Sequence, residues 1–338
     1  MNLFSHTPSR ATPTDDVRLS DAIGPLTVGD LSERFGGAIA VVIPAYDEAE
    51  NLSELLPRVP RHVGGVPAAV LVVDDGSADD TAGAALDGGA VLAHLPENRG
   101  GGAALRVGYA LMVAAGAGVV ITMDADGQHQ PEEIARLVEP VLSGRAQLVQ
   151  GSRVLGSSEP GAFARELGIA LFNLLVRVLT RVRVTDCSNS FRAIHTELLP
   201  ELELHQPQFH AAEFLIEALT RDFVFEEVPV SVLSRRHGRS KKPATVRYGF
   251  GFAWAITSAW RRSILRRGTT RAGIRPARSR GAGRRRAQAP RGSPRLTPDP
   301  RARLVGRSQR EDCAGGGIAD PEALQLVADH GKQHPDPE

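Results

Sequence analysis

The chain has 338 residues, of which 42% are hydrophobic and 23% are charged, and its formal net charge is +1. This length allows one large or two modest domains with an adequate core, whereas two cysteines, Cys187 and Cys313, exclude a disulfide framework. No stretch reaches the roughly 18 apolar residues of a membrane-spanning helix and no signal peptide is visible, so we expect a cytoplasmic protein.

Residues 1–36 are rich in Ser, Thr, Pro and Asp, and apart from a short helix allowed at 28–35 we expect a disordered leader there. From residue 37 onward, apolar runs of strand length alternate with segments of helix length. The expected strands span 38–44, 68–73, 90–95, 119–123 and 147–151, and the expected helices span 47–58, 81–86, 98–115 and 132–142. Such alternation predicts an α/β fold with a Rossmann-like, mostly parallel sheet, helices on both faces and ligands at the carboxyl ends of the strands.

The strand at 119–123 ends abruptly on Asp124-Ala125-Asp126-Gly127-Gln128, and a helix with Pro131 in its first turn follows. Because side chains alternate along an extended segment, Asp124 and Asp126 lie on the same side and can both face one ion. Hard oxygen ligands of this kind suit Mg²⁺ or Mn²⁺ that is also held by a substrate's phosphates. The alternative is a solvated strand-to-helix turn, since Asp and Gly are common turn residues.

The second half of the chain no longer shows the regular strand–helix alternation. Residues 163–180 and 209–220 are predicted helices, and 223–233 is a strand or hairpin. The first helix is apolar around much of its circumference, which suits either a core helix or a helix lying against a lipid acceptor or membrane surface. The stretch 248–260 is apolar and aromatic but too short to span a membrane.

An arginine-rich tail ends the chain. Residues 261–310 contain 17 Arg, no Lys and one acid, so this segment carries +16 while the rest of the chain carries about −15. Arg, Gly, Pro and Ala dominate from residue 268, and we expect a disordered tail over 263–338. The folded domain is accordingly expected at 37–262.

Six motifs occur in an order that is typical of one enzyme family. They are VVIPAYDEAENL (41–52), VVDDGSADDT (72–81), NRGGGAALRVGY (98–109), MDADGQHQPEEI (123–134), Asp186 with Phe191-Arg192, and RRHGRSKK (235–242). Over about residues 38–262 the chain thereby resembles glycosyltransferase family 2, and within it the dolichyl- or polyprenyl-phosphate sugar transferases. The resemblance implies a glycosyltransferase A fold, a GDP- or UDP-hexose donor, Mg²⁺ or Mn²⁺ as cofactor, and inversion at the anomeric carbon.

The resemblance also implies roles for particular residues. The D-x-D motif and the glutamine after it would supply the metal ligands Asp124, Asp126 and Gln128. The residues implied for nucleotide-sugar binding are Pro44, Tyr46, Glu48, Asp75, Asn98, Gly100, Arg106 and Asp124. Among them, Asp75 is expected to accept hydrogen bonds from the base or ribose. The implied catalytic set joins Asp124 and Asp126 to cations that would hold two phosphates, namely Arg153, Arg192, Arg235 and Lys241.

The acceptor is the part of the reaction with two departures from the family pattern. Ser190 stands where the family usually has Gly, and Arg239 stands where it usually has an acid. A polyprenyl phosphate is ionised near neutral pH and needs no base, whereas a sugar hydroxyl would need proton removal. We expect transfer of mannose or glucose to dolichyl or polyprenyl phosphate, and transfer to a hydroxyl of a glycan, glycolipid or small molecule is the alternative.

A further alternative, from a different class of protein, is nonspecific binding through the arginine-rich tail. Arginines without interleaved aromatic residues predict attraction to phosphate but no specific nucleic-acid partner. Anionic lipid is an equally suitable partner, because each basic residue near such a surface contributes about 1 kcal/mol. We therefore expect peripheral contact with the cytoplasmic face of an anionic membrane, through residues 163–180, 248–260 and the arginines that follow.

Overall fold

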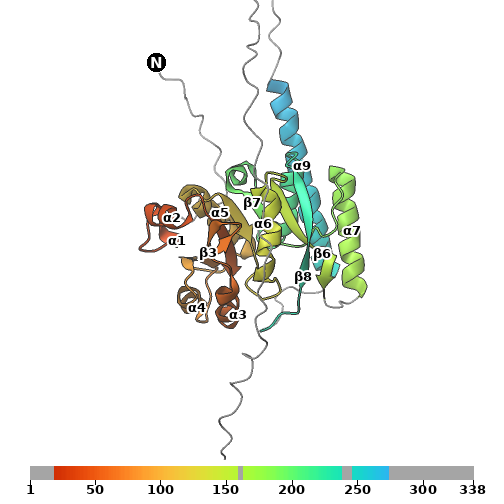
Figure 1. The fold of residues 1–338 in the computed structure, drawn as a ribbon. Coiled ribbons are helices and arrows are strands. Elements are labelled where there is room, and N and C mark those ends of the chain that lie inside the picture. The colour runs from red at the N-terminus through yellow and green to blue at the C-terminus, as the bar shows by residue number, and fades with distance from the viewer. Residues whose placement is uncertain (1–18, 159–162, 238–245, 274–338) are drawn as a thin grey trace, which may run out of the picture. The chain divides into compact units, whose positions relative to one another are not determined.

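The computed structural model describes residues 19–158, 163–237 and 246–273 (Figure 1). Within these residues one mixed sheet has the strand order β2-β3-β1-β5-β7-β6-β8, and β4 also pairs with β3. The sheet is parallel except at β2, which is antiparallel to β3, and at β7, which is antiparallel to both β5 and β6. The strands are β1 (Ile39–Ala45), β2 (His62–Val63), β3 (Val66–Asp74), β4 (Val91–His94), β5 (Val119–Thr122), β6 (Leu148–Ser158), β7 (Arg192–His195) and β8 (Phe225–Val232).

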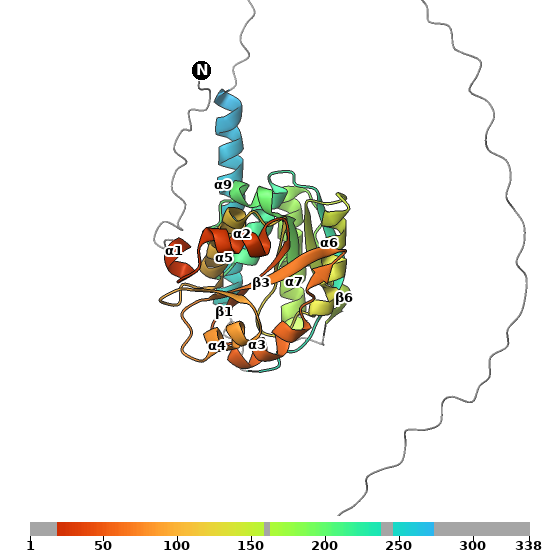
Figure 2. The same cartoon turned by 60° about the vertical axis from the view of Figure 1, so that its left-hand side comes forward.

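Helices cover both faces of this sheet, as the alternation in the sequence predicted (Figure 2). The α-helices are α1 (Leu19–Ala22), α2 (Val28–Phe35), α3 (Ala49–Leu55), α4 (Thr81–Asp87), α5 (Gly101–Ala115), α6 (Ile134–Leu142), α7 (Phe163–Thr180), α8 (His210–Leu219) and α9 (Val246–Gly273). Short 3₁₀ turns lie at η1 (Leu56–Arg58), η2 (Pro131–Glu133) and η3 (Thr196–Glu201). The predicted mixed α/β architecture is confirmed.

The two faces of β1 show how the strand sequence builds two cores. Ala40 and Val42 belong to the core that includes residues of α1, α2, α5, α7, α8 and α9, whereas Ile39, Val41 and Ile43 belong to the core that includes residues of α3, α4 and α6. Both sets are fully buried, which explains why β1 is a continuous apolar run rather than an alternating one. Figure 1 shows α7 and α9 beside each other at one side of the sheet, and the two helices are in contact.

Gly108 sets how closely α5 approaches the sheet. A Cβ atom at this position would come within 2.5 Å of Cγ1 of Val42, so only glycine allows the observed packing. Helix α5 can therefore lie directly on β1 and β3, and its first turn is carried to the carboxyl ends of these strands.

The folded part begins earlier than the expected boundary at residue 37, because α1 and α2 belong to it. Helix α2 starts with a capping box, in which Thr27 and Asp30 exchange side-chain and backbone hydrogen bonds. Its residues Leu31 and Phe35 are buried in the core beside α5. The short helix allowed at 28–35 is therefore present, while residues 1–18 of the expected leader lie outside the described residues.

Three other features differ from the sequence expectations. Strand β7 was not predicted, β6 extends to Ser158 instead of ending near 151, and residues 223–233 form one strand, β8, rather than a hairpin. Helix α9 continues to Gly273, past the expected start of the tail, and the rest of the tail lies outside the described residues. No helix in the described ranges is long and apolar enough to cross a membrane.

Candidate active site

The carboxyl ends of β1, β3 and β5 meet at one edge of the sheet. The register pairs Ala45 of β1 with Asp74 of β3, and the next residue, Asp75, donates its N–H to the Ala45 carbonyl at 2.8 Å. Two predicted residues, Tyr46 and Asp75, therefore leave the sheet side by side. Pro44 is the second-to-last residue of β1, and both Pro44 and Tyr46 are half-buried at this edge.

The turn after β5 carries the two carboxylates and is closed by a hydrogen bond from a backbone N–H to a carboxylate. Oδ1 of Asp126 accepts the N–H of Gln128 at 3.2 Å, and Gly127 between them has φ = +71°, a conformation that favours glycine. The Gln128 side-chain amide donates to the Leu233 carbonyl at 2.9 Å, which ties this turn to the end of β8. The orientation of Gln128 is therefore fixed from a different strand.

His129 follows this turn and stabilises it, although the sequence analysis did not predict a role for it. Its Nδ1 accepts the N–H of Asp124 at 3.3 Å, its Nε2 lies 3.1 Å from Oδ1 of Asn189, and its ring stacks on Phe191 at 4.9 Å. Because Asn189 and Phe191 precede β7, the ring joins the carboxylate turn to the neighbouring strand. A histidine in the Q-H-Q sequence gives no hint of this packing, which depends on a strand about sixty residues away.

Burial raises the pKa of Asp126 above its ordinary value, and the charge of Asp124 raises it further. His129, the Gln128 N–H and Arg235 act in the opposite direction. Two carboxylates and an amide oxygen are the hard donors that Mg²⁺ and Mn²⁺ prefer, and a cation would relieve the unfavourable charge at Asp126, so the residues present fit such an ion. Within the described ranges, no group of three or more His, Cys, Asp and Glu side chains could hold a metal by itself.

Arg235 connects the turn to the end of β1. It forms an ion pair with the buried Glu48, and its Nη1 lies 3.7 Å from Oδ2 of Asp126. The second oxygen of Glu48 accepts a hydrogen bond from Nδ2 of Asn51 at 2.7 Å, so the carboxylate is fully engaged within the protein. Glu48 therefore fixes Arg235, and both predicted residues lie beside the carboxylate turn.

The glycine loop before α5 is held by Asp75. Its two carboxylate oxygens accept the N–H groups of Arg99 at 2.8 Å and Gly100 at 2.7 Å, and Gly100 has φ = +89°. Burial raises the pKa of Asp75. The structure thus gives Asp75 a defined role in closing the loop, in addition to the contact with base or ribose that the resemblance implied. Asn98, in the same loop, is exposed.

Arg106 lies one and a half turns into α5, away from the loop itself. Burial lowers the pKa of its guanidinium, and the nearby carboxylate of Glu213 in α8 acts in the opposite direction. Its Nε and Nη1 are buried without a hydrogen-bond partner among the described residues. Arg106 thus lies within the electrostatic reach of α8, and its role in nucleotide-sugar binding stays a prediction.

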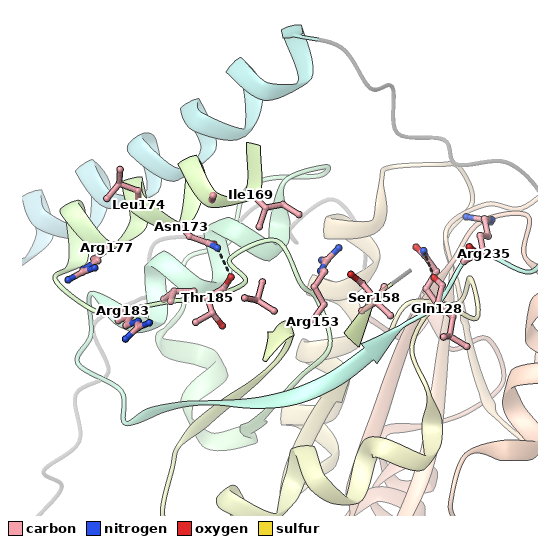
Figure 3. A pocket seen from close by; sticks show the side chains of 16 residues that line it. Gln128, Arg153, Ser158, Ile169, Asn173, Leu174, Arg177, Arg183, Thr185 and Arg235 are labelled. Carbon is pink, nitrogen blue, oxygen red and sulfur yellow. Dashed lines mark hydrogen bonds between the residues drawn. The ribbon is translucent and has the colours of Figure 1, made fainter. Parts of the chain in front are cut away.

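A cavity of about 730 Å³ opens beside the turn (Figure 3). Its wall comes from the second half of β6, from α7, from residues 183–185 and from the end of β8. The residues that line it include four arginines, Arg153, Arg177, Arg183 and Arg235, and no aspartate or glutamate. The remaining wall is largely apolar, with Val154, Ile169, Ala170, Leu174, Val184, Val232 and Leu233, and Gln128 lies at the end next to the turn. The cavity therefore combines cationic groups with an apolar lining.

The four arginines differ in how they are held. Nε of Arg153 is 2.7 Å from Oδ2 of the buried Asp186, and Arg235 is paired with Glu48, so both are fixed in position. Arg177 and Arg183 are exposed and form no ion pair within the part of the chain that the structure describes. These two were not selected from the sequence, although the arginines spaced along the apolar 163–180 segment were a signal for Arg177.

Arg192 is not in this cavity. It is 2% exposed, its Nη2 donates to the carbonyls of Asn189 at 2.6 Å and Ala211 at 3.1 Å, and its guanidinium lies 4.6 Å from the ring centroid of Phe214. Burial lowers its pKa to about 10. The structure thus separates Arg192 from the cavity that Arg153 and Arg235 line, because its side chain turns inward beneath α8. The charge of Asp124 still acts on its guanidinium, and a catalytic role for Arg192 stays a prediction. Lys241 and Arg239 lie outside the described residues.

Comparisons with known proteins point to one enzyme family. A family model described as glycosyl transferase family 2 matches residues 40–202. The chain is 34% identical over 214 residues to a polyprenol monophosphomannose synthase of Mycolicibacterium smegmatis, covering 60% of this chain and 79% of that protein. It is 31% identical over 215 residues to an undecaprenyl-phosphate mannosyltransferase of Micrococcus luteus, covering 60% of this chain and 86% of that protein.

Among solved structures, the fold is similar to glucosyl-3-phosphoglycerate synthase from Mycobacterium tuberculosis in complex with phosphoglyceric acid. The TM-score is 0.54 at 25% sequence identity, and the match covers 70% of this chain and 85% of that chain. The matched family region contains the carboxylate turn, the glycine loop and Arg153, whereas Arg235 lies beyond it.

Proposed function

The chain belongs to glycosyl transferase family 2 and has a glycosyltransferase A fold, and on this premise we propose that it transfers a hexose from a nucleoside-diphosphate sugar to a polyprenyl phosphate. The observation that carries the proposal is the cavity beside Gln128, whose lining combines four arginines with apolar side chains. A polyprenyl phosphate needs this combination, because its head is an anion and its chain is a hydrocarbon.

The donor half of the proposal rests on the strand ends. Asp124, Asp126 and Gln128 would hold Mg²⁺ or Mn²⁺ together with the donor's diphosphate, and the ion would act as a Lewis acid on the leaving group. Glu48 and Asp75 keep Arg235 and the glycine loop in place around the nucleotide. We propose a GDP- or UDP-hexose, with mannose or glucose as the sugar.

The acceptor half rests on the arginine cavity. Arg153 and Arg235 are held by Asp186 and Glu48, so they are already oriented before a phosphate arrives. An ionised phosphate oxygen would attack the anomeric carbon directly, and the bond from that carbon to the diphosphate oxygen would break with inversion. No proton has to be removed from the nucleophile, so a general base is not required.

We also propose that the enzyme binds the cytoplasmic face of an anionic membrane, where a long polyprenyl chain resides. Helix α7 exposes Leu171, Leu174 and Val178, and the adjacent α9 exposes Phe250 and Trp254, each more than half accessible to solvent. We call these five residues the apolar face. Exposed arginines occur at 177, in α7, and at 181 and 183, directly after it, which favours contact with anionic headgroups.

Liposome flotation tests this contact. The full chain should float with anionic vesicles at low salt, and high salt or the double change Phe250→Ser with Trp254→Ser should weaken this binding. Leu86→Ser is the control, because Leu86 is also more than half exposed but lies on α4, on the other face of the sheet. A protein that stays free of anionic vesicles at low salt would contradict the proposed membrane contact.

The transfer reaction itself is tested by offering GDP- and UDP-hexoses with a short polyprenyl phosphate, with and without Mn²⁺. We expect a lipid-linked sugar to form from one donor and only with the metal. If sugar is instead transferred to a glycan or small-molecule hydroxyl, and never to the lipid phosphate, the acceptor assignment is wrong while membership of the family stands.

A further inference from the structure

Helix α8 carries two fully buried glutamates, Glu213 and Glu217, that face α9. Glu213 pairs with Arg262, and Glu217 pairs with Arg266, whose Nη2 lies 2.9 Å from Oε1. Both glutamates are 0% exposed, and a charge buried this deeply requires a partner. The two ion pairs fix α9 to α8. They do not account for the backbone hydrogen bonds that the second oxygen of each glutamate accepts.

The second oxygens of the two glutamates hold different stretches of backbone. Oε2 of Glu213 accepts the N–H groups of His205 and Gln206, both at 2.7 Å. Oε2 of Glu217 accepts the N–H of Glu203 at 3.3 Å. Both acceptors are carboxylates, but Glu213 accepts two bonds of 2.7 Å, whereas Oε2 of Glu217 accepts one of 3.3 Å and is shared with Arg221 and Arg266. Glu213 therefore fixes the 205–206 backbone more firmly than Glu217 fixes residue 203.

The segment held by Glu213 presses directly on the glycine loop. The N–H of Gly102 donates to the Pro207 carbonyl at 2.7 Å. A Cβ atom at Gly102 would lie 2.0 Å from the Gln206 carbonyl oxygen, and one at Gly100 would lie 3.1 Å from Pro207. The loop is thus in contact with residues 206–207 on one side, while Asp75 holds the N–H groups of Arg99 and Gly100 on the other.

We propose that Glu213 is a positioning residue for the donor, which acts by holding residues 205–207 against the glycine loop. This inference rests on the proposed function, in which the glycine loop lies against the nucleotide sugar. Glu213 does not touch the substrate. It makes the loop rigid before the donor binds, so that the ordering of the loop does not reduce donor affinity.

The test compares Glu213→Gln with Glu217→Gln. Both changes are isosteric, and both remove one buried charge from α8. Glu217 pairs with Arg221 as well as with Arg266, so the loss of overall stability in Glu217→Gln should be at least as large as in Glu213→Gln. Only Glu213→Gln loosens the 205–206 backbone. We expect its donor KM to rise about tenfold with kcat within about twofold, whereas donor KM in Glu217→Gln stays within about twofold of the unchanged chain.

Hydrogen–deuterium exchange supplies a readout that does not depend on activity. The amides of residues 99–102 should exchange at least about tenfold faster in Glu213→Gln than in Glu217→Gln. Gly102→Ala separates the same two segments from the loop side without touching α9, and it should reproduce the rise in donor KM. Equal loop exchange and equal donor KM in the two glutamine variants would overturn the proposal. If the unchanged chain binds neither GDP nor UDP, the proposed function fails, but the exchange comparison still decides whether Glu213 holds the loop.

Discussion

Arg177 and Arg183 give the sharpest test of where the acceptor phosphate binds. Both line the cavity, whereas Arg181 lies between them in the sequence, is exposed as they are, and is not part of the cavity wall. The three changes Arg177→Gln, Arg183→Gln and Arg181→Gln remove the same charge from the same surface. Any difference among them must therefore come from the position of the side chain and not from the net charge.

The expected magnitude follows from the exposure of these arginines. A hydrogen bond to a charged group contributes about 1.5–3 kcal/mol in a buried site, and an exposed ion pair contributes about 0.2–1 kcal/mol. Because Arg177 and Arg183 are exposed at the mouth of a cavity, we take about 1 kcal/mol for each. Each single change should then raise the KM for a short polyprenyl phosphate about fivefold, and the double change about 25-fold if the contributions add.

The assay measures initial rates against the short polyprenyl phosphate at a saturating donor concentration, at low and at moderate salt. Donor KM is the internal control and should stay within about twofold of its original value. Loss of acceptor affinity in Arg181→Gln equal to that in the other two variants would mean that the arginines act only through long-range attraction. A rise in donor KM with unchanged acceptor KM would assign the cavity to the donor instead.

The remaining predictions concern the donor side. Asp126→Ala should lower transfer by at least about a thousandfold while circular dichroism and thermal melting show a folded protein, and normal turnover in a folded variant would refute a role as metal ligand. EDTA should abolish transfer and Mn²⁺ or Mg²⁺ should restore it; full activity in chelator would remove the ion from the mechanism. Because burial raises the pKa of Asp75, this residue should become protonated at a higher pH than an ordinary aspartate. Its hydrogen bonds to the N–H groups of the glycine loop then weaken, and donor KM should rise. In Asp75→Asn, donor KM should be high at every pH. Burial disfavours the ionised form of Asp75, so protonation stabilises the folded state. The unfolding free energy of the unchanged chain, relative to this variant, should therefore increase as pH falls.

Most of the sheet could be predicted from the sequence, because its central strands are continuous apolar runs that end on Asp or Tyr. Strand β7 could not be predicted, since Arg192–His195 is only four residues long and contains one β-branched residue. Its strand conformation depends on hydrogen bonds to β5 on one side and β6 on the other. The outer half of β6 was missed for a related reason, because its exposed residues have no apolar period and it is held by pairing with β8 across an irregularity.

The site could be predicted where it lies on strand ends and not where it depends on side-chain direction. The strand pattern predicted that Asp75 and Asp126 lie at one edge of the sheet, and the RRHGRSKK motif predicted that Arg235 belongs to the site. The same reasoning grouped Arg192 with them, yet its neighbours Ala211 and Phe214 draw the guanidinium beneath α8. Arg183 was missed because its place in the cavity wall is set by the turn after α7, which no local pattern specifies.

The position of Arg235 indicates where the two substrates would meet. Among the four arginines that line the cavity, it is the one that forms an ion pair with the carboxylate turn, 3.7 Å from Asp126. Glu48 holds it there through a buried ion pair. Burying the two charges costs solvation free energy, which an arginine that only stabilises the surface would not lose. A guanidinium fixed between two anion sites would lower the repulsion between an incoming phosphate and a departing diphosphate. The reacting anomeric carbon is therefore expected at the Gln128 end of the cavity, where the apolar wall gives way to the turn.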